Sequence, residues 1–134
     1  MPTESIDRES LRKAEAILLA HPAVEAAYLL GSAAENRLRE DSDVDIAILL
    51  RKSSSITGEE RLALSAALAR VCHRSVDLGV LSTRNLVFAK EAVAKGRLLA
   101  ERDHVVTATF AMHVLSMYAA LQVARREVLH AYAA

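Results

Sequence analysis

Two aspartates stand two residues apart at the start of an apolar run, in the segment "GSAAENRLREDSDVDIAILL" of residues 31–50. Because side chains alternate along a strand, Asp43 and Asp45 are predicted to point to the same face. Aspartate is disfavoured in strands and like charges repel, so this arrangement costs stability unless a cation lies between the acids. A third acid, Asp77, lies in the later apolar segment "SVDLGVL". Three carboxylates supply the oxygen ligands that a hard divalent cation prefers, and Mg²⁺ is the natural candidate.

A Gly-Ser pair precedes these acids in the same segment. Protein-bound Mg²⁺ usually takes some of its ligands from phosphates, so a phosphate-binding turn beside the carboxylates is chemically sensible. Gly31 allows close approach of the backbone, and Ser32 with the N–H groups of the next turn can bind phosphate oxygens. Each short motif alone is more often a turn or a solvated loop, but the two together at this spacing predict a nucleotide site.

Hydrophobic periodicity predicts the elements that must position these residues in the first half of the chain. Residues 7–21 have helical spacing and end before Pro22, and residues 24–31 form a short buried strand. Residues 43–50 form a second strand, with Val44, Ile46 and Ile48 on the face opposite the acids. Between the strands, residues 32–40 are predicted to form one or two helical turns with Ser32 near the N-cap.

The second half of the chain is predicted to supply one more strand and three helices. Thr57 and Glu60 have the spacing of a capping box for a helix through residue 73, and residues 75–81 form the third strand. A helix starting at Ser82 or Thr83 is closed by Gly96, and residues 97–103 lead into the last helix.

The order of elements predicts an α+β fold, with a small mixed sheet, helices packed on it and a long C-terminal helix. We expect one domain over residues 1–134, with a core of about 24–101 and the last helix at about 103–130. That helix is apolar on more than one side. Two interpretations stay open: it packs wholly on the sheet, or part of it is buried by another copy or another protein.

The composition of the chain limits which binding partners and which cellular compartment are expected. Lys plus Arg equals Asp plus Glu at 17 each and aromatic residues make up 4%, so nucleic acid is not expected to be a direct partner. Cys72 is the only cysteine, and a buried helical thiol is expected there. The N-terminus has no apolar signal core, and residues 105–124 contain polar side chains, so we expect a cytoplasmic protein without a membrane span.

The segment at residues 31–50 resembles the Gly-Ser, ten-residue, Asp-x-Asp signature of the polymerase beta-like nucleotidyltransferase superfamily. "SVDLGVL" stands where that superfamily carries its third acid. The match is to the minimal nucleotidyltransferase branch. Within it, "VDLGVLSTRNLVFAKEAVAKGRLLAERD" resembles the MntA-type antitoxins of HEPN/MNT toxin–antitoxin pairs. The resemblance covers about residues 24–130.

This resemblance implies transfer of a nucleoside monophosphate from a nucleoside triphosphate to a hydroxyl, with pyrophosphate leaving. It implies that Gly31 and Ser32 hold the triphosphate and that Asp43 and Asp45 hold two Mg²⁺ ions. Asp77 would hold one of the ions and also act on the acceptor hydroxyl. ATP is the donor that the resemblance suggests.

One departure from the family pattern affects nucleotide binding. Many members have Arg-Gly where this chain has Glu35 and Asn36, and an acid near a triphosphate is unfavourable. Arg37 and Arg39 follow closely and are expected to substitute as nucleotide-binding cations. Because of this departure, two alternatives stay open: a catalytically weak enzyme, or a protein that binds without catalysis.

The acceptor is expected to come from another molecule, because the chain ends after the core and one helix. The resemblance implies a type VII-like antitoxin, a protein adenylyltransferase that transfers AMP to a tyrosine of a cognate HEPN-type ribonuclease toxin. Two alternatives remain: a nucleotidyltransferase with a small-molecule or nucleic-acid acceptor, and an antitoxin that neutralises its partner by binding alone.

Overall fold

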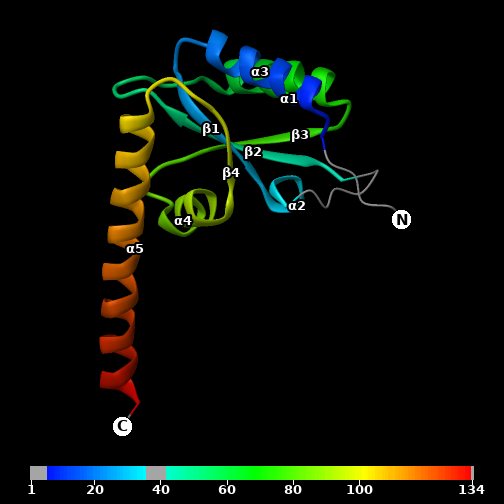
Figure 1. The fold of residues 1–134 in the computed structure, drawn as a ribbon. Coiled ribbons are helices and arrows are strands. Elements are labelled where there is room, and N and C mark those ends of the chain that lie inside the picture. Colours follow the sequence, from blue (N-terminus) through cyan, green and yellow to red (C-terminus); the bar gives the residue numbers. More distant parts are fainter. Residues whose placement is uncertain (1–5, 36–41, 134) are drawn as a thin grey trace.

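The computed structural model describes residues 6–35 and 42–133, and their strands form one sheet in the order β3-β2-β1-β4 (Figure 1). The strands are β1 (Val24–Leu30), β2 (Val44–Leu50), β3 (Val76–Val80) and β4 (Arg97–Glu101). β1 is antiparallel to both β2 and β4, whereas β2 and β3 are parallel. The sheet is therefore mixed, as predicted.

Helices cover both faces of this sheet (Figure 1). They are α1 (Arg8–Ala20), α2 (Gly31–Ala34), α3 (Gly58–Cys72), α4 (Leu86–Lys95) and α5 (His104–Tyr132). α1 and α3 lie together on one face, and α4 lies on the other. α5 packs along α4 and then continues beyond the sheet. The predicted α+β architecture with a long C-terminal helix is confirmed.

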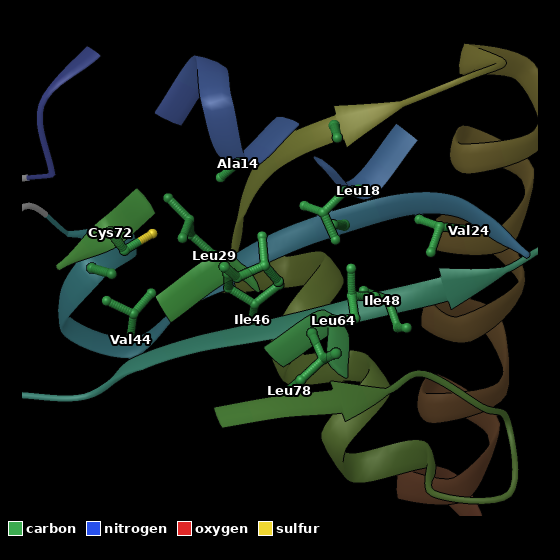
Figure 2. Packing of buried hydrophobic residues seen from close by; sticks show 14 residues of the cluster. Ala14, Leu18, Val24, Leu29, Val44, Ile46, Ile48, Leu64, Cys72 and Leu78 are labelled. Carbon is green, nitrogen blue, oxygen red and sulfur yellow. The ribbon is translucent and has the colours of Figure 1, made fainter. Parts of the chain in front are cut away.

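The larger core lies between the sheet and the pair α1 and α3 (Figure 2). Alternation along β2 turns Val44, Ile46 and Ile48 to this side, and all three are buried. Leu18 of α1 and Leu68 of α3 are fully buried against them. The prediction that these three β2 residues share the face opposite the acids is confirmed. Asp45 therefore lies on the face of the sheet away from α1 and α3.

The second core lies under α4, and half of its buried residues are alanines. Ala26, Ala47, Ala89 and Ala92 are fully buried there. Small residues on both the strands and the helix let α4 approach the sheet closely while keeping native packing density. This close approach brings Phe88 of α4 to the site.

Strand β4 was not predicted, because residues 97–103 were expected only to lead into the last helix. β4 is a five-residue edge strand in which Ala100 is the one buried residue, so it lacks the apolar alternation that marks a strand. Arg102, which follows β4, holds the end of this strand against the C-terminal end of α1. Its guanidinium donates hydrogen bonds to the carbonyls of Leu19 and His21 at 2.6 and 2.8 Å.

The start of α4 was predicted incorrectly, and α2 begins without the predicted side-chain cap. Asn85 is the N-cap of α4, so the prediction of Ser82 or Thr83 was wrong; Ser82 instead accepts a hydrogen bond from the N–H of Arg84 within the preceding turn. Ser32 is not the N-cap of α2, which begins at Gly31 without a side-chain cap. The prediction that Gly96 closes α4 is confirmed, since its N–H donates to the carbonyl of Ala92.

The capping box of α3 is present as predicted. The Thr57 hydroxyl accepts from the N–H of Glu60 at 3.0 Å, and the Glu60 carboxylate accepts from the N–H of Thr57 at 3.3 Å. Thr57→Ala is expected to lower the free energy of unfolding by about 1 kcal/mol, because an unsatisfied N–H is left at the helix start. Urea denaturation measures this loss. Ser55→Ala in the same exposed loop is the control, and equal midpoints for the two variants would contradict the role of the box.

The single cysteine, Cys72, is buried in the last turn of α3 and is free, as predicted. Burial raises the pKa of its thiol. A buried, protonated thiol is inert and behaves as a small apolar side chain. Cys72 is therefore part of the core.

Helix α5 is far more exposed than a core helix. Only Thr107 and Val114 are buried along its described length, so the interpretation that it packs wholly on the sheet is wrong. Residues 123–133 are all exposed. By length and composition, and on no other ground, α5 is the one described helix that meets the criterion for a membrane span.

Candidate active site

The sheet register brings Gly31 and the predicted acids to one end of the sheet. Asp45 and Asp77 are direct partners across the parallel strands β2 and β3. Leu30, the last residue of β1, is the antiparallel partner of Asp45, so Gly31 follows immediately beside it. Asp43 lies two residues before Asp45, at the entrance to β2. Residues far apart in sequence therefore meet because β1 ends where β2 and β3 begin.

The backbone conformation at position 31 favours glycine. Its φ is +58°, in the left-handed region that side chains other than glycine rarely adopt. An ideal Cβ there would lie 3.5 Å from Oδ2 of Asp45. The turn into α2 thus places the backbone of Gly31 directly against the carboxylate. Ser32 follows in α2, whose first N–H groups have no partner within the helix.

The acids repel one another in this arrangement. Burial raises the pKa of Asp45, and the charges of Asp77 and Asp43 raise it further. A cation between these carboxylates would remove the repulsion. The predicted position of the acids on one face is consistent with this coupling.

The fit to Mg²⁺ rests on the chemistry of these donors. Within residues 6–35 and 42–133, no group of three or more potential ligands already lies close enough to hold a metal ion. Mg²⁺ sites usually need only one or two carboxylates, with water and substrate phosphates completing the shell. The registered pair Asp45 and Asp77, next to the Gly31 turn, meets that requirement.

A cavity of about 350 Å³ lies over the two acids. It is lined by Leu30, Asp45, Ile46, Arg61, Asp77, Gly79 and Phe88. Phe88 reaches over from α4, and Gly79 leaves room for it, since an ideal Cβ on Gly79 would lie 2.8 Å from Cζ of the ring. A glycine inside a strand is typical of such a close approach, so Gly79 is the feature of the sequence that points to this contact.

Other predicted positions lie at the margin of the site. Glu35 lines a neighbouring cavity of about 340 Å³ together with Gly31, Phe88 and Lys95. The acid that replaces the family arginine therefore lies beside the Gly31 turn. The predicted cations Arg37 and Arg39 lie outside the described residues, as does Asn36.

Residues 12–105 match the family described as Polymerase beta, Nucleotidyltransferase. The match spans well over half of the chain and includes the Gly31 turn and all three acids. The chain belongs to this nucleotidyltransferase family.

Comparison with individual proteins gives a finer likeness. The protein adenylyltransferase MntA of Shewanella oneidensis is 29% identical over 110 residues, which are 81% of this chain and 76% of MntA. A chain in the crystal structure of a toxin–antitoxin with AMP-PNP has a TM-score of 0.75 at 27% identity, over 92% of this chain and 98% of its own. A chain in the complex of tri-AMPylated Shewanella oneidensis HEPN toxin with MNT antitoxin has a TM-score of 0.70 at 26% identity, over 93% and 97% of the two chains.

Proposed function

We propose that this chain is an antitoxin that acts as an Mg²⁺-dependent protein adenylyltransferase. It transfers AMP from ATP to a tyrosine of a cognate HEPN-type toxin, in the cytoplasm. The observation that carries the proposal is the registered pair Asp45 and Asp77 beside the left-handed turn at Gly31. The similarity to a protein adenylyltransferase and to toxin–antitoxin complexes over nearly the whole chain supports the choice of acceptor.

Each group has a defined task in this reaction. The backbone at Gly31 and Ser32 binds the β- and γ-phosphates. Asp43, Asp45 and Asp77 are the proposed Mg²⁺ ligands, with two ions as the family resemblance implies. When bound, the ions neutralise charge on the phosphates and make the acceptor hydroxyl more acidic. We infer that Asp77 takes the hydroxyl proton as the acceptor oxygen attacks the α-phosphorus.

Helix α5 is the proposed contact with the toxin. An apolar seam runs along it at alternating spacings of four and three residues, formed by Phe110, Val114, Met117, Leu121, Ala124 and Val128. The first four of these are at least partly buried, whereas Ala124 and Val128 are exposed. The seam that packs on α4 thus continues past the body of the protein without a partner in the described chain (Figure 1). A regular 3.5-residue repeat is typical of a helix that packs on another helix.

A second candidate function is neutralisation by binding alone. Glu35 beside the Gly31 turn favours it, because a carboxylate there opposes binding of a triphosphate. In that case the toxin would be inhibited by occlusion, and no AMP would be transferred. A small-molecule or nucleic-acid acceptor is supported by no feature of the described site.

The test is transfer from ATP to the toxin encoded beside this chain, followed by the intact mass of the toxin. With Mg²⁺, we expect a mass gain of one or more AMP units on the toxin and none on this chain. Omission of Mg²⁺ is expected to abolish the gain. A stable complex without any mass gain would favour binding alone, and AMP transfer only to a small molecule or to RNA would overturn the protein acceptor.

A further inference from the structure

Arg61 lies next to the candidate active site, on the side away from Gly31. It belongs to the first turn of α3, and its Nε donates to the carbonyl of Leu78 at 2.7 Å. This bond ties the guanidinium to the outer edge of β3. Arg61 and Asp77 line both the cavity over the acids and a second groove of about 340 Å³ along that edge. The groove is lined by Gly58, Arg61, Leu62, Ser65, Val76, Asp77 and Leu78.

The outer edge of β3 is partly occupied by side chains of α3. Carbonyls of Val76 and Leu78 point away from β2, and both already accept hydrogen bonds from side chains of α3. The Ser65 hydroxyl donates to Val76 at 2.6 Å, and Arg61 donates to Leu78. These side-chain hydrogen bonds compete with any strand that would pair along this edge. The groove is instead suited to a single inserted side chain.

The charge of Arg61 is available to a ligand. It is the only cation among the described residues that line the groove and the cavity over the acids. Among the described residues, no carboxylate lies within ion-pair distance of Arg61. Only the Nε of its guanidinium donates a hydrogen bond in the described structure. Its terminal nitrogens can therefore donate to an oxygen in the groove. Leu62 adds an apolar wall, with 71% of its surface exposed.

The order of groups across the sheet gives the groove a direction. Gly31 follows β1, Asp45 is on β2, Asp77 is on β3, and Arg61 lies beyond the free edge of β3. In phosphoryl transfer the attacking and leaving oxygens lie on opposite sides of the phosphorus. With the pyrophosphate held at the Gly31 end, the nucleophile must come from the Arg61 end.

We propose that this groove is the acceptor site, and that it takes a phenol side chain from the protein partner, with Arg61 bound to the phenolic oxygen. The inference rests on the proposed function and adds the residue that recognises its acceptor. The phenolic O–H passes its proton to the Asp77 carboxylate, and the oxygen forms a bond to the α-phosphorus. The bond from that phosphorus to the bridging oxygen breaks, and pyrophosphate leaves with the electron pair. A guanidinium beside the oxygen favours its ionised form, and Leu62 contacts the ring.

The experiment compares Arg61→Gln and Arg61→Lys with Arg70→Gln, a cation further along α3 that does not line the groove. Transfer is measured in the complete complex with its toxin, at saturating ATP and Mg²⁺, together with the KM for ATP. Arg61→Gln is expected to slow transfer at least about tenfold while the KM for ATP stays within about twofold. Arg61→Lys is expected to recover part of the rate, and Arg70→Gln to behave as wild type.

A second variant separates this role from a folding defect. Leu62 is exposed, so Leu62→Ser is expected to fold normally and still slow transfer several-fold by removing the apolar wall. A raised KM for ATP with an unchanged rate in Arg61→Gln would assign Arg61 to the triphosphate and overturn the inference. Normal transfer by both Arg61→Gln and Leu62→Ser would overturn it as well. Absence of transfer by the wild type would instead remove the proposed function itself.

Discussion

Asp45→Asn is expected to lower the rate of AMP transfer by about a thousandfold or more, without loss of fold or of toxin binding. The carboxylate is the registered partner of Asp77 and lies against Gly31, so it is central to the proposed donor set for Mg²⁺. Asparagine keeps the shape but removes the negative charge that a divalent cation needs. Intact mass of the toxin over time measures the rate. Glu15→Gln, an exposed acid on α1 across the sheet, is the matched control.

The same variant is expected to be at least as stable as the wild type at neutral pH. Because the pKa of Asp45 is raised in the fold, the native state binds protons more readily than the unfolded state. Stability of the wild type therefore falls as pH rises from the ordinary aspartate pKa through the raised one. The Asp45→Asn protein has no carboxylate to ionise at this position. Its Tm should therefore exceed that of the wild type at neutral pH, and this difference in Tm should vanish in acid.

Thermal unfolding also tests the cation site directly. Mg²⁺ with ATP is expected to raise the Tm of the wild type, since a ligand that binds only the native state stabilises it. The Asp45→Asn protein should show little of this rise. Equal Tm shifts in both proteins, or full transfer by the variant, would show that Asp45 does not hold the metal.

Local sequence patterns predicted most residues of the candidate site, whose roles stay predictions. The Asp-x-Asp spacing placed Asp45 on the face away from the core, and the apolar alternation of β2 fixed that face. The Gly-Ser turn and the third acid were found from type and spacing. Their meeting point follows from the sheet topology, since β1 must end where β2 and β3 begin.

Features that depend on tertiary contact were missed. Edge strand β4 has one buried residue and is held by pairing with β1, so its sequence carries no strand pattern. Arg61 was indistinguishable from any charged residue of a helix, because its position beside Asp77 comes from how α3 packs against β3. Phe88 reaches the candidate site because α4 packs on the sheet there and Gly79 leaves room for its ring.

Replacing Val128 and Leu129 together with glutamine is expected to weaken the complex with the toxin by about a hundredfold or more. Both side chains lie on the unpartnered end of α5, with 57% and 68% of their surfaces exposed. Burial of each at an interface is worth about 1.5–3 kcal/mol. Glutamine is a good helix former, so the helix itself should persist. Titration calorimetry measures the affinity, and the Tm of the free protein should change little.

Val105→Gln provides the matched control, since Val105 is equally apolar and 71% exposed but lies at the other end of α5. It is expected to bind the toxin as the wild type does. Wild-type affinity in the double variant would place the toxin elsewhere. Sedimentation of the free chain tests whether a second copy of this chain covers the end of α5 instead. A wild-type dimer that is lost in the double variant would mean that this end of α5 buries a second copy. Retained binding by Asp45→Asn alongside lost binding by the α5 variant would separate the catalytic end of the molecule from its docking helix.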